Sequence, residues 1–165
     1  MSSISVMSEN DNSTVLAEYT GLNRVATSFQ SEDDLEKELI NTLIEQGYER
    51  LTINSEDELI FNLREQLEKL NNYHFSDGEW DYFFTKVIAN KNDYIIEKTR
   101  LIQEDYKQEI TLDSGEKKNI YLIDKNNIHN NSLQVLNQYV NNGGNFDNRY
   151  DVTILVNGLP LVHVE

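Results

Sequence analysis

The chain of 165 residues contains no cysteine, which excludes disulfide bonds and thiolate chemistry and fits a reducing cytoplasm. It has no apolar run of the roughly 18 residues that a membrane-spanning helix needs. Residues 1–14 lack the basic start and the apolar centre of a signal peptide. The sequence therefore favours a soluble protein of the cytoplasm that is not associated with a membrane.

Basic side chains are also scarce, since 14 Lys and Arg stand against 29 Asp and Glu, for a net charge of −15. Proteins gain affinity for nucleic acids mainly by neutralising phosphates, so the chain by itself is expected to repel DNA. Any DNA on which it acts must be held by something else. The sequence contains no ATP-binding motif. Its one glycine pair, Gly143-Gly144, follows a predicted helix and does not open a phosphate-binding loop.

Turn and capping signals predict a mixed α/β domain. Residues 1–15 are rich in Ser and Asn and are predicted to form a mobile arm. Three capping patterns, which begin at Ser31, Ser55 and Ser76, predict helix starts. The predicted helices are Ser31–Gln46, Ser55–Leu70, one that begins at Ser76, Asp93–Ile102 and Ser132–Val140. The predicted strands are Tyr48–Ile53, Glu109–Leu112, Asn119–Ile123 and the two strands of a final hairpin.

The final hairpin consists of two apolar runs on either side of Asn157-Gly158, which is a strong signal for a tight turn. The first run begins with Asp151 and the second ends with Glu165. A strict two-residue loop would place these two carboxylates on opposite faces of the hairpin. A three-residue loop or a bulged turn would instead place both on one face.

We favour the bulged register, because it separates a chemical face from an apolar face. It predicts that Asp151 pairs with Glu165, Thr153 with His163, and Leu155 with Leu161. The opposite face would then be wholly apolar, with Val152, Ile154, Val156, Pro160, Val162 and Val164. Two carboxylates on one face are suitable ligands for Mg²⁺.

The closing stretch R-Y-D-V-T-I-L-V-N-G-L-P-L-V-H-V-E resembles the nuclease motif in the restriction (R) subunit of type I restriction-modification enzymes. The resemblance extends over nearly the whole chain, in the same order, through Q-S-E-D-D-L-E-K-E-L-I from Gln30, G-Y-E from Gly47, L-R-E-Q-L-E-K-L-N from Leu63 and I-Y-L-I-D-K-N-N from Ile120. Two departures occur. Tyr150 replaces the usual proline, which this family tolerates, and the lysine that follows the Glu two places later is not in this sequence.

The resemblance implies a PD-(D/E)xK site in which Asp151 and Glu165 are the catalytic acids and the ligands of Mg²⁺. In nucleases of this fold a helix acid can complete the metal shell, which makes Glu36 a candidate third ligand. Glu32 is a weaker candidate, because acids in a first helical turn also stabilise the helix dipole. His163 is expected beside the site, as a neighbour more often than as a ligand.

The resemblance also implies a larger protein with a restriction-endonuclease-like fold, a mixed sheet flanked by helices. Residues 16–165 would be the N-terminal part of its endonuclease domain, truncated at the C-terminus and without the motor domains. The parent enzyme would cleave double-stranded DNA with Mg²⁺, coupled to ATP-driven translocation, together with methyltransferase and specificity subunits. ATP would not bind this fragment, and without the lysine and the motor the fragment by itself is expected to be inactive.

A second reading belongs to another class of protein. The charge of −15 would suit a non-catalytic acidic module, either an assembly platform or a DNA mimic that occupies a DNA-binding surface. A mimic, however, has no use for carboxylates paired beside an apolar hairpin. We therefore favour the nuclease reading.

Overall fold

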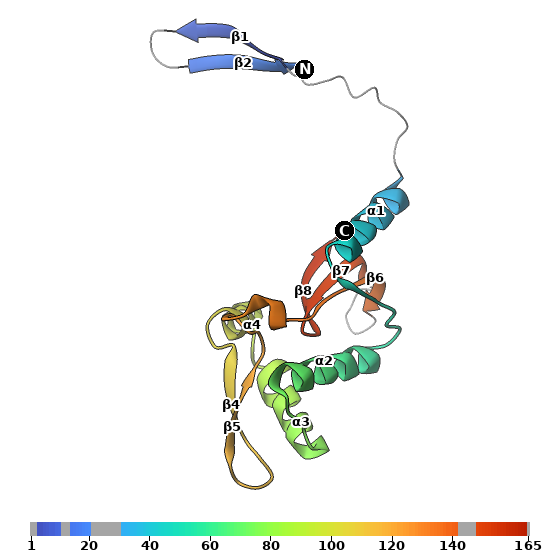
Figure 1. Ribbon diagram of the computed structural model, residues 1–165, viewed down its shortest axis with the longest axis vertical. Helices are drawn as coiled ribbons and strands as arrows, with labels where there is room; N and C mark the ends of the chain where they lie inside the picture. Colours follow the sequence, from blue (N-terminus) through green and yellow to red (C-terminus); the bar gives the residue numbers. More distant parts are fainter. Residues whose placement is uncertain (1–2, 11–13, 21–30, 142–147, 165) are drawn as a thin grey trace. The chain divides into compact units, whose positions relative to one another are not determined.

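A computed structural model describes the backbone of residues 3–10, 14–20, 31–141 and 148–164, and the side chains of residues 31–137 and 152–164 (Figure 1). The chain divides into two units, residues 1–35 and 36–165. In the first unit, β1 (Ser3–Asn10) and β2 (Thr14–Thr20) form an antiparallel hairpin. The mobility predicted for residues 1–15, and the domain boundary after them, stay predictions.

The part of the chain that the structure describes contains four α-helices, and the first three begin where the capping patterns predict. Ser55 and Ser76 each accept a hydrogen bond from the backbone N–H three residues on, and Ser76 forms a full capping box with Glu79. The Ser31 hydroxyl accepts in the same way from Asp34 N–H at 3.2 Å. The helices are α1 (Glu32–Glu45), α2 (Glu56–Asn71), α3 (Asp77–Phe83) and α4 (Ile95–Gln103), with a π-helical turn η1 (Phe84–Ile88) directly after α3 and a short 3₁₀ turn η2 (Ile128–Asn130).

The described strands of the second unit form one mixed sheet and one separate hairpin. The sheet has the order β3-β6-β7-β8, in which β3 runs parallel to β6 and the other neighbours are antiparallel. Its strands are β3 (Glu49–Leu51), β6 (Leu133–Asn141), β7 (Asn148–Val156) and β8 (Leu159–Val164). The separate hairpin consists of β4 (Lys107–Thr111) and β5 (Lys117–Tyr121). The mixed α/β class predicted from the sequence is confirmed.

The helix predicted over Ser132–Val140 is wrong, because this segment is strand β6. Leu133, Leu136 and Val140 recur at helical spacing, which favours a helix when the segment is considered alone. In the fold, β6 lies between β3 and β7, and Gln134, Val135 and Leu136 are all buried. A strand covered on both faces loses the alternation of polar and apolar residues that identifies a strand in sequence. Gly143-Gly144 lies outside the described residues.

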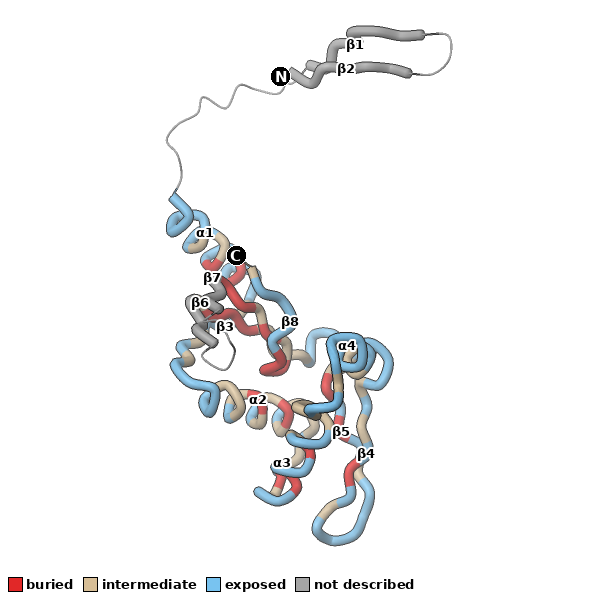
Figure 2. Tube along the Cα trace, turned by 180° about the vertical axis from the view of Figure 1, so that it is seen from behind, coloured by how far each residue is buried: buried red, intermediate tan, exposed pale blue. Residues whose placement is uncertain are grey.

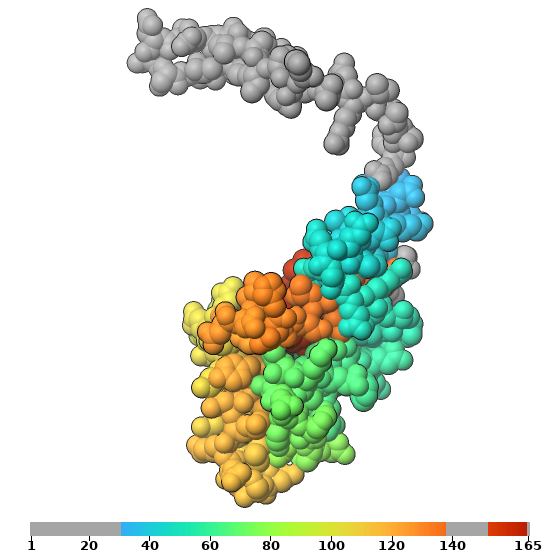
Figure 3. Space-filling model, in the orientation of Figure 1, coloured from blue at the N-terminus to red at the C-terminus, as the bar shows by residue number. Residues whose placement is uncertain are grey.

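Two groups of buried apolar side chains hold the second unit together (Figure 2). One group packs α1 against the sheet through Ile40, Leu43, Val135 and Val152. The other group joins α2 and α3 to the β4–β5 hairpin, and Figure 3 shows the surfaces of these helices and of the hairpin side by side. Its buried members are Leu63, Leu67, Phe75, Trp80, Phe83, Ile110, Ile120, Leu122 and Leu159. Leu159 belongs to β8, so the end of the β7–β8 hairpin is part of this second core.

A buried carboxylate, Glu79, fixes the start of α3 to the β4–β5 turn. It is 8% exposed and accepts hydrogen bonds from the Tyr73 hydroxyl (2.7 Å), Ser76 N–H (3.0 Å) and Asp113 N–H (2.8 Å). These bonds, first of all the one from Tyr73, lower the pKa of Glu79 below its ordinary value. The same contact raises the pKa of Tyr73 to about 12.

We expect Glu79→Gln to lower the free energy of unfolding by about 1 to 3 kcal/mol at neutral pH, because a buried, charge-assisted network is lost. A carboxyl group whose pKa is lower in the folded state contributes stability above its unfolded pKa, and this stability disappears as the pH falls through its folded pKa. The difference between the two proteins should therefore shrink below about pH 4.5. Urea unfolding at several pH values measures it, with the exposed Glu65→Gln as control; a constant difference would contradict the assignment.

Candidate functional site

The β7–β8 hairpin turns through two residues and then shifts register by a bulge. Val156 pairs with Leu159 around Asn157-Gly158, Leu155 pairs with Pro160, and the register shifts so that Ile154 pairs with Val162. Leu161 is therefore the extra residue of the bulge. On the side of the bulge away from the turn, Thr153 pairs with His163 and Val152 pairs with Val164.

This register confirms the bulged alternative predicted from the sequence and corrects one of its pairs. The pairing of Thr153 with His163 is as predicted, whereas the predicted pair of Leu155 with Leu161 is wrong, because the extra residue lies within β8 and not in the loop. The turn keeps two residues because both are locked in the left-handed region, with φ of 51° at Asn157 and 79° at Gly158.

The turn is buried, which the sequence did not indicate. Asn157 is 1% exposed; its side-chain amide donates to Leu122 O (2.9 Å) and to Asn131 Oδ1 (2.8 Å), and its Oδ1 accepts from Ser132 N–H (2.8 Å). Gly158 lies directly against the backbone of Leu63 in α2. An Asn-Gly pair is ordinarily read as an exposed turn. Here it anchors the hairpin to α2 and to the segment after β5.

The two faces of the hairpin differ from the prediction near the turn. Val152 is buried, and Ile154 and Val164 pack against the same core below α1, as expected for the apolar face. Pro160 and Val162 of that face, however, are exposed, because β8 is the edge strand of the sheet. On the predicted chemical face Thr153 is only 3% exposed, and its Oγ1 lies 3.1 Å from Nδ1 of His163.

The two predicted catalytic carboxylates cannot be placed as side chains. Asp151 belongs to β7, directly before Val152, but its side chain lies outside the part of the structure that is described, and so does Glu165. Among the residues that are described, no group of three or more His, Asp or Glu side chains could hold a metal ion. The pairing of Asp151 with Glu165, and the Mg²⁺ site, stay predictions.

The candidate third ligand, Glu36, forms a hydrogen bond with β6, one of the two inner strands of the sheet. Asn137 of β6 donates from Nδ2 to Glu36 Oε1 at 3.3 Å, and accepts at Oδ1 from Arg50 Nη2 at 3.4 Å. Asn137 pairs in the ladder with Val152, the neighbour of Asp151. Glu32 lies in the first turn of α1, with an exposed side chain.

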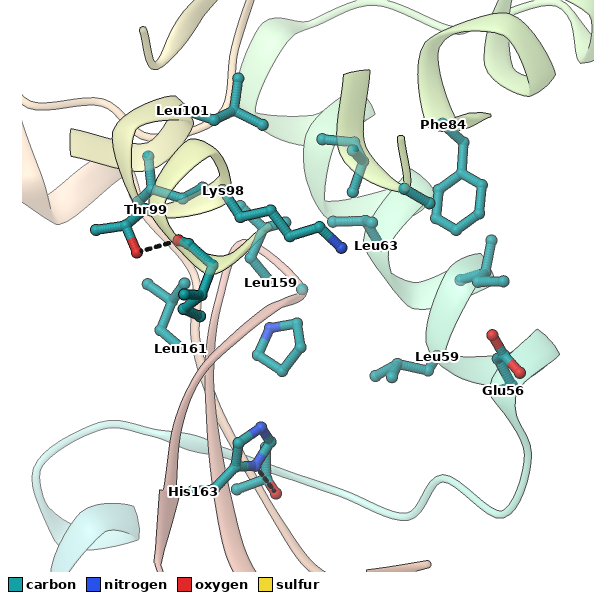
Figure 4. Close-up of a pocket in the computed structure, with 18 of the residues that line it drawn as sticks. Glu56, Leu59, Leu63, Phe84, Lys98, Thr99, Leu101, Leu159, Leu161 and His163 are labelled. Carbon is teal, nitrogen blue, oxygen red and sulfur yellow. Dashed lines mark hydrogen bonds between the residues drawn. The ribbon is translucent and has the colours of Figure 1, made fainter. Parts of the chain in front are cut away.

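A pocket of about 750 Å³ lies on the side of the hairpin that carries Thr153 and His163 (Figure 4). The other walls come from α2, η1 and α4, three elements to which the sequence assigned only a packing role. The α4 side contributes Lys98 and Thr99. No sequence signal identifies these residues, because α4 is placed beside the hairpin only by tertiary packing. In the part of the chain that is described, no helix is long and apolar enough to cross a membrane.

A mixed sheet whose strand β7 carries Asp151, with helices on its faces, is the arrangement expected for the nuclease region to which the sequence is similar. Residues 29–165 match the family described as "Type I restriction enzyme R protein N terminus". The chain belongs to this family.

Curated relatives agree with the family assignment. The chain is 44% identical over 160 residues to the type I restriction enzyme EcoprrI endonuclease subunit of Escherichia coli, which covers 96% of this chain and 51% of that protein. It is 36% identical over 145 residues to the SauCOLORF180P endonuclease subunit of Staphylococcus aureus strain COL, which covers 84% of this chain and 15% of that protein. The chain thus spans about half the length of the first relative and a much smaller part of the second.

Proposed function

We propose that the protein to which this chain belongs cleaves double-stranded DNA with Mg²⁺, and that cleavage is coupled to ATP-driven translocation by domains outside these residues. Methyltransferase and specificity subunits are its proposed partners. Membership of the family and the register of the β7–β8 hairpin support this function. The strong negative charge fits it as well, because DNA would be delivered by other parts of the enzyme.

The observation that carries the proposal is the register of β7 and β8. The pairs Thr153–His163 and Val152–Val164 follow from the same register that would bring Asp151 opposite Glu165. Without the bulge, the two carboxylates would belong to opposite faces. The bulge is therefore the feature that makes a shared metal site possible.

Asp151 and Glu165 are the proposed ligands of the metal, and Glu36 is the candidate third ligand. Carboxylate oxygens are the ligands that Mg²⁺ prefers, and a bound ion would polarise the scissile phosphate and acidify a bound water. The protein's own contribution is positional: α1 covers one face of the sheet through Ile40 and Leu43, and the anchored turn fixes β8 against β7. The hydrogen bond from Asn137 restricts Glu36 to the neighbourhood of the same strands.

We expect Asp151→Ala to reduce DNA cleavage by the assembled endonuclease by about 10² to 10³-fold or more, because one electrostatic contributor to the reaction is removed. ATP hydrolysis and translocation should remain, since the motor lies elsewhere. A plasmid-cleavage assay and an ATPase assay on the same preparation measure the two activities, with the exposed Asp105→Ala as control. Normal cleavage by Asp151→Ala would favour the acidic-module alternative.

A further inference from the structure

The pocket beside the hairpin combines apolar walls with one exposed cation. Its walls include Leu59 and Leu63 of α2, Phe84 of η1, and Leu159 of β8. Among the described residues that line it, Lys98 is the one Lys or Arg, and Glu56 is the one Asp or Glu. Figure 4 shows the Lys98 side chain extending from α4 across the cavity toward Leu63, whereas Glu56 lies at the far edge.

The ammonium group of Lys98 has no ion pair or hydrogen bond with any residue whose side chain the structure describes. Three cations of the same unit do form ion pairs with described carboxylates: Arg64 binds Glu68 and Asp77, Arg100 approaches Glu104, and Lys117 binds Glu109. Lys98 differs from the other cations without an ion pair in its position, because its side chain extends across a pocket with mostly apolar walls. Such a cation is suited to an anionic ligand.

The position of Lys98 identifies the class of anion. Thr153 and His163 also line the pocket, and they belong to the face that the register assigns to the catalytic carboxylates. A DNA strand bound at that face would lie beside the pocket, and its phosphates are the anions that a lysine binds as a point charge. The apolar walls can contact the sugars between the phosphates.

We propose that Lys98 binds a phosphate oxygen of the DNA strand in this pocket and positions the strand beside the β7–β8 hairpin. The inference rests on the proposed function, because it takes DNA as the substrate of this face. Lys98 is then a positioning residue that acts on the substrate next to the scissile phosphate. It contributes positive charge to the pocket that His163 also lines.

The test uses single-turnover DNA cleavage by the assembled endonuclease over a range of salt concentrations. We expect Lys98→Gln to slow cleavage by about tenfold, the effect of one lost charge-assisted hydrogen bond. The dependence of the logarithm of the rate on the logarithm of salt concentration should become shallower by about one phosphate contact. Lys98→Arg should restore most of the rate, and ATP hydrolysis should not change.

Arg100→Gln is the matched control, because it removes one positive charge from the same helix at a residue that does not line the pocket. A merely structural role of Lys98 would alter thermal unfolding and leave the salt dependence unchanged, and that result would overturn the inference. Equal rates for Lys98→Gln and the unaltered enzyme, or equal losses for Lys98→Gln and Arg100→Gln, would also overturn it. Asp151→Ala reports separately on the proposed function: normal cleavage by that variant rejects the nuclease site whatever Lys98→Gln does.

Discussion

Gly158→Ala is expected to lower the free energy of unfolding by about 3 to 5 kcal/mol, from two independent causes. The residue has φ of +79°, where any residue with a Cβ is strained. In addition, a Cβ at this position would lie 2.6 Å from the Cα of Leu63. Because the obstacle is helix backbone, α2 or the hairpin would have to move as a whole.

Gly47→Ala separates these two causes. Gly47 ends α1 with φ of +95°, but a Cβ there would meet nothing within 4 Å. This variant should lose only about 1 kcal/mol, the cost of the left-handed conformation. Urea unfolding followed by the fluorescence of Trp80, the single tryptophan, compares the two variants. Equal losses would mean that the hairpin does not pack against Leu63 as described.

Asn157→Gly is expected to cost about 2 to 4 kcal/mol, even though glycine adopts the left-handed conformation more easily than asparagine does. The loss comes from the side chain, since Leu122 O, Asn131 Oδ1 and Ser132 N–H would all lose a partner in a buried place. Unsatisfied buried polar groups are costly because the protein interior offers no water to replace the bond.

Asn72→Gly provides the control for this prediction. Asn72 has nearly the same backbone conformation, with φ of 45°, but it is the exposed C-cap of α2. There the substitution should change stability little, because the backbone strain that it relieves is offset by the greater freedom of glycine in the unfolded chain. A loss at Asn72 as large as that at Asn157 would show that the side-chain bonds of Asn157 are not what stabilises the hairpin.

Gly158→Ala and Asn157→Gly differ from Asp151→Ala in the property that each is expected to change. Gly158 and Asn157 fix the hairpin in the fold, so their replacement should lower stability and cleavage together. Asp151 lies in β7 some residues before the turn, and its replacement should lower cleavage without a comparable loss of stability. Measuring both quantities on all three variants therefore separates the scaffold of the site from its chemistry.

Local signals in the sequence determined where the capped helices begin and where the last hairpin turns. The serines at 55 and 76 accept hydrogen bonds within three residues of their own position, so their effect depends little on the rest of the fold. Asn157-Gly158 likewise prescribes a tight turn through its own backbone preference. The family membership was also readable from the sequence, because the motif residues follow one another in order.

Tertiary structure decided what depends on neighbours distant in sequence. Residues 133–141 became a strand because β3 and β7 supply hydrogen-bonding partners on both sides, although their apolar spacing also suits a helix. The bulge came to lie at Leu161 because the buried turn is held by Leu63, Leu122 and Ser132 and cannot take a third residue. Lys98 lines the pocket only because α4 packs beside the hairpin. Local propensity cannot encode such contacts, since each depends on surfaces that exist only after the chain has folded.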